Sequence, residues 1–189
     1  MMSLMRLVLM LCMVFLVGGC GVADRVGNRM SDSWAGDLFG NQERVRVVIA
    51  SDASLNPDTQ GEPLSVVVRL YQLGELPPFA TAAPDQLWDN PDDVLGEALL
   101  SQRELTVLPG DEKIDVAALD EKTRYVGIAA FFRHTQRNVW HVALDADELR
   151  RDGLLSASEG IRVRLVDDRI ELERGDDLIN RQVTAGSGH

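Results

Sequence analysis

The fold is decided by the longest β-prone stretch after the N-terminal leader, Leu64-Ser65-Val66-Val67-Val68-Arg69-Leu70-Tyr71-Gln72-Leu73. Its three consecutive valines are branched at Cβ, which restricts χ1 and favours extended backbone. Side chains alternate between the faces of a strand, so Val66, Val68 and Leu70 form one apolar face. Arg69 and Tyr71 lie on the other face, which indicates only partial cover there. The stretch therefore predicts a central strand with its apolar face on the core.

Seven other segments are β-prone and bounded by turn residues such as Gly, Pro, Asn and Asp. They cover residues 44–50, 104–107, 112–116, 125–132, 139–144, 161–165 and 169–172. Gly127 lies inside one of them and indicates a bulge or a close backbone approach. About eight short strands with little helix predict an all-β fold, a two-layer antiparallel β-sandwich.

Residues 79–100 differ from the rest and predict a small, partly helical insertion between strands. Pro84 is suited to the first position of a helical turn. Residues 94–100 fit a helix or a strand by periodicity alone, so both structures remain open at this point.

The N-terminus is typical of a lipoprotein signal peptide. Arg6 precedes an unbroken apolar run over residues 7–17, which is too short to span a bilayer comfortably. Small residues then lead to Cys20, as in a bacterial lipobox. The alternative is an ordinary signal peptide with a chance cysteine, but residues 21–189 contain no other cysteine that could pair with Cys20. We therefore expect a covalent diacylglyceryl and N-acyl lipid on Cys20, and no other cofactor.

The domain organisation follows from these patterns. We expect a signal peptide over residues 1–19, the lipidated cysteine and a tether over 20–42, the β-sandwich over 43–174, and a polar tail over 175–189. Gly21 follows the lipidated cysteine, where an aspartate would signal retention in the inner membrane of enterobacteria. This glycine predicts sorting to the outer membrane.

Composition and motifs argue against several classes of function. The formal net charge of −11 opposes binding to nucleic acid or to anionic lipid headgroups. His134, His141 and His189 have no metal-ligand spacing, and each is predicted to be a solvated surface residue. The chain has neither a nucleophile elbow nor a phosphate-binding glycine loop. The acidic pairs at 92–93, 167–168 and 176–177 lack the spacing of a calcium loop. We therefore expect a binding protein without a metal rather than an enzyme.

A series of motifs in a fixed order resembles a known family. The series comprises Leu55-Asn56-Pro57-Asp58 with Gly61, residues 67–73, Phe79, Leu87, Leu95-Gly96, Leu99-Leu100, Leu108-Pro109-Gly110, residues 125–133 and Trp140. Behind a lipobox cysteine, it resembles the TssJ (SciN/VasD-type) outer-membrane lipoproteins of bacterial type VI secretion systems. Two features depart from the family: Trp140 is followed by His141 rather than arginine, and the chain beyond Leu172 is longer.

The resemblance implies a transthyretin-like β-sandwich, a lipid anchor in the outer membrane and a domain in the periplasm. It implies a non-enzymatic structural subunit that tethers the periplasmic C-terminal region of TssM to the outer membrane, within a TssJ–TssL–TssM complex. The loop between the first two strands is the family's region for TssM contact. Here it spans residues 51–62, with the expected contact residues Asn56, Pro57, Asp58, Thr59 and Gln60.

Two other readings remain open from the sequence. One is an unrelated periplasm-facing outer-membrane lipoprotein whose β-sandwich is a ligand-binding or assembly module. The other is a hydrolase whose nucleophile and base come together only in the folded chain.

Overall fold

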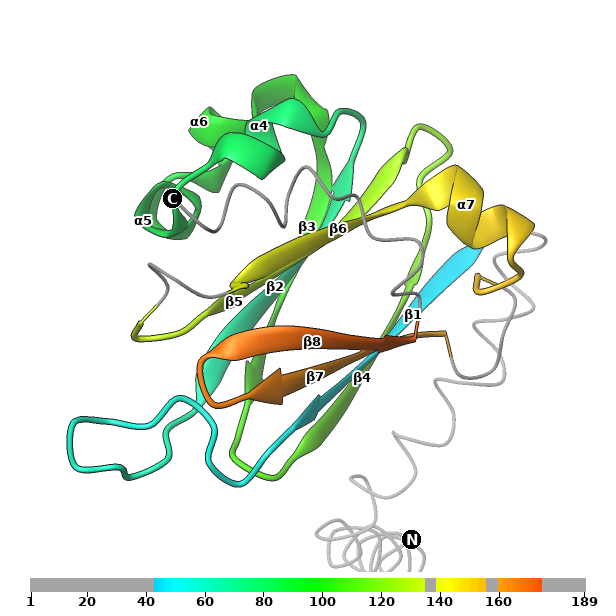
Figure 1. Ribbon diagram of the computed structural model, residues 1–189. Helices are drawn as coiled ribbons and strands as arrows, with labels where there is room; N and C mark the ends of the chain where they lie inside the picture. Colours follow the sequence, from blue (N-terminus) through cyan, green and yellow to red (C-terminus); the bar gives the residue numbers. More distant parts are fainter. Residues whose placement is uncertain (1–42, 135–138, 156–159, 175–189) are drawn as a thin grey trace, which may run out of the picture. The chain divides into compact units, whose positions relative to one another are not determined.

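The computed structural model describes residues 43–134, 139–155 and 160–174 (Figure 1). Contacts divide the chain into Met1–Gln42 and Glu43–His189, and all the described residues belong to the second unit. Its strands are β1 (Arg44–Ser51), β2 (Val66–Leu73), β3 (Leu99–Val107), β4 (Glu112–Ala118), β5 (Tyr125–Phe131), β6 (His141–Asp145), β7 (Ile161–Val166) and β8 (Arg169–Arg174). Its helices are α4 (Pro77–Thr81), α5 (Pro84–Asp89), α6 (Pro91–Leu95), the 3-10 turn η1 (Gly96–Ala98) and α7 (Ala146–Arg151).

The eight strands form two four-stranded sheets, which confirms the predicted β-sandwich. The first sheet has the order β4-β1-β7-β8 and the second the order β3-β2-β5-β6. All neighbouring strands are antiparallel except β1 and β7, which are parallel. Each sheet therefore combines strands that are far apart in the sequence.

Strand β2 is central, as its sequence predicts, because it pairs with β3 on one side and β5 on the other. Val66, Val68 and Leu70 are at most 2% exposed and belong to the core between the sheets. Each such side chain stabilises the fold by about 1.5–3 kcal/mol through removal of apolar surface from water. The strand begins at Val66 rather than at Leu64, since Leu64 donates its N–H to the Leu55 carbonyl instead of to a neighbouring strand.

The insertion forms helices that cover the outer face of the β3-β2-β5-β6 sheet. Pro77, Pro84 and Pro91 each begin one of α4, α5 and α6, where their missing N–H costs no helical hydrogen bond. Phe79 of α4 packs over Gly127 of β5, where an added Cβ would lie 2.9 Å from the Phe79 Cζ atom. Of the two features expected at Gly127, a bulge or a close backbone approach, the structure shows the close approach.

The segment left open between helix and strand contains both structures. Residues 94–95 end α6, η1 follows, and β3 begins at Leu99. Strand β3 is therefore longer than the predicted segment 104–107, and it forms one edge of its sheet. Helix α7 was not predicted, although Asp145 is a typical N-cap that accepts hydrogen bonds from the backbone N–H of Asp147 and Glu148.

The prediction that His141 is a solvated surface residue is wrong. Its side chain is 2% exposed and lies against Phe79, with ring centroids 5.2 Å apart, and against Trp140, with centroids 3.9 Å apart. The residue faces outward from β6, but the helical insertion covers that face of the sheet. Burial lowers the pKa of His141 to about 4, because the low-dielectric surroundings disfavour the charged imidazolium.

Candidate partner-binding surface

The loop between β1 and β2 is ordered by Asn56. This residue is 5% exposed, and its backbone has the positive φ of 49° that asparagine tolerates well. Its amide Nδ2 donates to the Ser65 carbonyl at 3.0 Å, and its Oδ1 accepts the Arg133 N–H at 2.8 Å. Its own N–H donates to the Asp167 carbonyl. The side chain of this buried residue thus connects the loop to the start of β2 and to the end of β5, and its backbone N–H connects it to the β7–β8 turn.

Beyond Asn56, the tip of the loop is shaped by Asp58. One carboxylate oxygen, Oδ1, accepts the N–H groups of Gln60 at 2.8 Å and of Glu62 at 2.9 Å. These hydrogen bonds, with that to Glu62 the stronger influence, lower the pKa of Asp58. Gly61 completes the turn with a φ of 88°, a conformation that glycine adopts without strain. The tip therefore has a defined shape before any partner binds.

The expected contact residues differ in their exposure. Thr59 and Gln60 are exposed at the tip, and Pro57 and Asp58 are half-buried. Asn56 has little surface left for a partner and uses its amide within the chain. The loop hence offers four of the five expected residues as surface. Cys20 lies outside the described residues.

Two other turns border this loop at the same end of the sandwich. Ser51 at the end of β1 donates its hydroxyl to the Leu108 carbonyl at 2.7 Å, and it accepts the Asp111 N–H at 3.1 Å. Leu108 and Asp111 belong to the β3–β4 turn, which contains the Leu108-Pro109-Gly110 motif of the family series. From the other side, Ser54 donates to an Asp167 carboxylate oxygen in the β7–β8 turn, at 2.7 Å. The sequence gives no sign of these contacts, because Ser51 and Ser54 bond residues more than fifty positions away.

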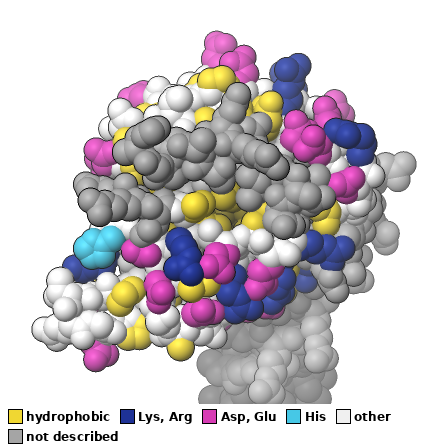
Figure 2. Space-filling view, in the orientation of Figure 1, with side chains coloured by type: hydrophobic (Ala, Val, Ile, Leu, Met, Phe, Trp, Pro, Cys, Tyr) yellow, Lys and Arg dark blue, Asp and Glu magenta, His cyan; other side chains and the backbone are white. Residues whose placement is uncertain are grey.

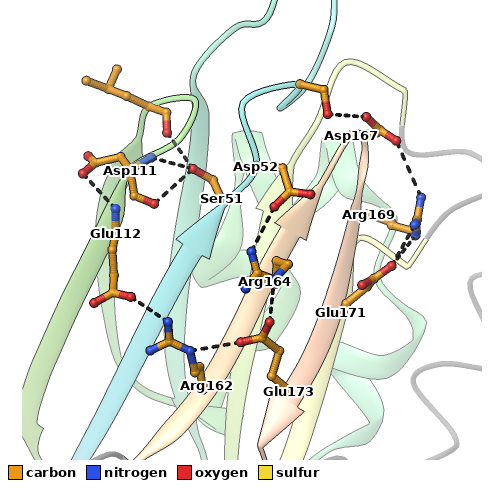
Figure 3. A network of polar contacts seen from close by, with 12 residues as sticks. Ser51, Asp52, Asp111, Glu112, Arg162, Arg164, Asp167, Arg169, Glu171 and Glu173 are labelled. Carbon is orange, nitrogen blue, oxygen red and sulfur yellow. Dashed lines mark hydrogen bonds and ion pairs between the residues drawn. The ribbon is translucent and has the colours of Figure 1, made fainter.

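A network of ion pairs lies on the outer face of the β4-β1-β7-β8 sheet, next to these turns (Figure 3). Arg162 contacts Glu112 at 2.7 Å and Glu173 at 3.0 Å. Arg164 contacts the same Glu173 and also Asp52 at the start of the loop, at 3.0 Å. The two arginines, Arg164 first, lower the pKa of Glu173. Exposed pairs of this kind each contribute little to stability, but together they fix the orientation of the side chains on this face.

The described chain begins at the opposite end of the sandwich. The Glu43 carboxylate contacts Arg150 of α7 at 2.7 Å, and the Glu43 carbonyl accepts the Leu119 N–H at 2.8 Å. In Figure 1 the start of β1 and α7 lie at the upper right, while the β1–β2 loop lies at the lower left. The eight residues of β1 separate the two ends by about 26 Å. The tip of the loop therefore projects away from the point where the chain enters the domain.

A group of aromatic residues, which the sequence did not single out, surrounds Arg69 on the helix-covered face. The Arg69 guanidinium contacts Glu104 at 2.8 Å and donates to the carbonyls of Leu87 and Trp88, at 2.7 and 3.0 Å. It also lies over the rings of Trp88 and Phe131. The only sequence signal was the position of Arg69 on the half-covered face of β2.

Other expected sites can be compared with the described part of the chain. His134 is exposed, and His189 lies outside the described residues. Within residues 43–134, 139–155 and 160–174, no group of three or more His, Cys, Asp or Glu side chains could hold a metal ion. Within the same ranges, no helix is both long and apolar enough to cross a bilayer.

The fold and the ordered loops define the class of the protein: a β-sandwich binding domain with a helical insertion on one sheet. The sequence profile of the type VI secretion lipoproteins (VasD, EvfM, TssJ, VC_A0113) matches residues 43–168, and the chain belongs to this family. It is therefore a TssJ-type lipoprotein of the type VI secretion membrane complex, a structural component and not an enzyme. This assignment replaces the two alternative readings. No curated protein matches the chain.

Solved structures agree with the family. The type VI lipoprotein TssJ1 from Pseudomonas aeruginosa is 28% identical, with a TM-score of 0.60 over 69% of this chain and 95% of that one. A structure described as the TssM C-terminal domain from EAEC matches at 25% identity and a TM-score of 0.59, over 69% and 97% of the two chains. A type VI membrane complex matches at 25% identity and a TM-score of 0.62, over 70% and 98%.

Proposed function

We propose that the chain is held in the outer membrane by the lipid on Cys20 and binds the periplasmic C-terminal region of TssM through its β1–β2 loop. In this role it tethers the TssJ–TssL–TssM complex to the outer membrane. The arrangement of β1 carries the proposal, because the chain enters at one end of the strand and the ordered loop tip projects from the other. A domain anchored at its entry end would present the tip towards the periplasm.

The order of the loop supports its role in binding. Asn56 and Asp58 hold the tip through hydrogen bonds that are already present in the free chain. A preordered loop loses less conformational entropy on binding than a flexible one, which increases affinity. The family match and the similarity to a chain of a type VI membrane complex support a role within that complex.

Replacing residues 57–60 by Gly-Ser-Gly-Ser tests the contact surface. The full mature chain in non-ionic detergent is passed over the immobilised periplasmic C-terminal region of TssM, and its dissociation constant is measured. We expect the replacement to weaken binding about tenfold or more, since it removes the side chains and the preorganised shape together. A matched control replaces Glu121 and Lys122, exposed in the β4–β5 turn near the entry end, and should bind as the wild type does. If the loop replacement binds TssM as tightly as the control variant and the wild type do, the loop is not the contact.

Substitution of Cys20 tests the anchor separately. The Cys20→Ser chain lacks the thiol that carries the lipid, so we expect it to leave the outer-membrane fraction while it still binds TssM in solution. The measurement is fractionation of the cell envelope followed by detection of the chain. If the serine variant stays in the outer-membrane fraction, the proposed lipid anchor is wrong.

A further inference from the structure

The helical insertion carries uncompensated negative charge. Between Gly74 and Gln102 the chain has no Lys, Arg or His, yet it has six carboxylates: Glu75, Asp85, Asp89, Asp92, Asp93 and Glu97. All six are exposed, and none of them forms an ion pair with any residue that the structure describes. In Figure 2 acidic side chains lie over the upper left of the molecule, where Figure 1 places these helices. On the outer face of the β4-β1-β7-β8 sheet, by contrast, the carboxylates are paired with arginines.

An exposed tryptophan lies within this acidic surface. Trp88 of α5 is 44% exposed, whereas Trp140 is 4% exposed. Asp85 is three residues before Trp88 on α5 and so shares its face of the helix, and Asp89 follows directly. Aromatic residues are enriched at protein interfaces, and tryptophan in particular among the few residues that carry most of the binding energy.

The indole ring of Trp88 is held in place by side chains of the sheet beneath the insertion, from β2 and β5. The Arg69 guanidinium lies 4.9 Å from its centroid, and the Phe131 ring meets it edge-on at 5.0 Å. Arg69 also binds the Trp88 carbonyl at 3.0 Å, so both the ring and the backbone of Trp88 are fixed to β2. A rigid aromatic side chain loses little entropy when a partner covers it, which suits an interface anchor.

We propose that α5 and α6 form a second docking surface, which binds a Lys- or Arg-rich peptide segment of a protein partner. Trp88 supplies apolar contact and an aromatic ring for a cation, and the surrounding carboxylates supply complementary charge. The sign of the charge excludes nucleic acid and anionic lipid as occupants. This surface lies on the insertion and is separate from the β1–β2 loop.

The test uses the full mature chain in non-ionic detergent and a fluorescein-labelled 12-residue peptide of alternating arginine and serine. A second peptide has glutamine in place of each arginine. Fluorescence anisotropy at low salt should show binding of the arginine peptide at least about tenfold tighter than of the glutamine peptide. Trp88→Ala should weaken binding about tenfold, while Trp88→Phe, which keeps an aromatic ring, should remain within about threefold of the wild type.

A charge-matched pair of variants separates a local site from the net charge of the chain. Asp85→Asn, Asp89→Asn and Glu97→Gln together remove three carboxylates from the insertion. Glu62→Gln, Glu121→Gln and Asp152→Asn remove three exposed carboxylates elsewhere. The first triple variant should weaken binding about tenfold and the second less than twofold, although both change the net charge equally.

Three results would overturn the proposal: no preference for the arginine peptide, an unchanged affinity after Trp88→Ala, or equal losses from the two triple variants. The triple variants change only exposed side chains and so keep the test valid if Trp88→Ala fails to fold. The TssM binding assay reads a different surface, so either proposal can fail without the other.

Discussion

The burial of His141 predicts that the domain loses stability as the pH falls from about 7 to 4. In the unfolded chain the imidazole has its ordinary pKa of about 6.5. In the folded domain burial lowers the pKa to about 4, although the backbone of Ala80 acts in the opposite direction. Among the described residues neither imidazole nitrogen has a hydrogen-bond partner of normal geometry. Between these pKa values the unfolded chain binds a proton that the folded chain does not, so protonation favours unfolding.

The size of the effect follows from the difference between the two pKa values. A pKa difference of about 2.5 corresponds to about 3 kcal/mol, lost in full only below pH 4. At pH 5 the loss is about 2 kcal/mol, because most unfolded chains are then protonated while most folded chains are not. Above pH 7 the contribution is constant, since His141 is neutral in both states.

The assay is urea unfolding of the full mature chain at pH 7.5, 6 and 5, followed by tryptophan fluorescence. Two variants that do not titrate in this range, His141→Phe and His141→Gln, are measured beside the wild type. Both are expected to lose about 2 kcal/mol less than the wild type between pH 7.5 and 5, whatever their stability at pH 7.5. The lowered pKa values of Asp58 and Glu173 affect all three chains alike. Parallel stability curves for wild type and variants would show that His141 is not buried in its neutral form.

Two predictions concern the residues that position the loop and the insertion. Gly127→Ala should destabilise the domain by about 1–3 kcal/mol, because its Cβ would lie 2.9 Å from the Phe79 ring, and urea unfolding measures this loss; a change below about 0.5 kcal/mol would show that α4 moves away freely. Asn56→Ala should cost about 1–3 kcal/mol, since it leaves the Ser65 carbonyl and the Arg133 N–H without their partner. Hydrogen exchange of residues 57–62 should become faster in this variant, and unchanged protection would show that the tip is ordered without Asn56.

The strands could be predicted because their alternation is strong where one face lies on the core. In β7 the inward residues Ile161, Val163 and Leu165 alternate with arginines, and the burial follows the same period. The fold class follows from many such short segments, and the family resemblance gave the same sandwich. Both predictions are confirmed by the two sheets.

The sequence could not predict which outer face of a sheet is covered by another element. His141 reads as a solvated residue on an outward face, and no local pattern shows that α4 packs over it. A weak signal was present in the small residues Gly127, Ala129 and Ala143, which lie beside His141 on the same face. Such a row leaves room for a ring, in this case that of Phe79. The contact between Asn56 and Arg133 is similarly hidden, because it joins positions that only the strand order brings together.

Strand β2 supports both proposed binding surfaces. At its start, the Ser65 carbonyl accepts the Asn56 amide that holds the β1–β2 loop, and four residues later Arg69 binds the Trp88 carbonyl of α5. Its neighbour β5 makes the same connection, since Phe131 contacts Trp88 and the N–H of Arg133 binds Asn56. A partner held at either surface therefore pulls on strands at the centre of a four-stranded sheet rather than on a free loop. Such an arrangement suits a subunit that must hold its partners in place, because displacing either surface requires breaking contacts of the central strands.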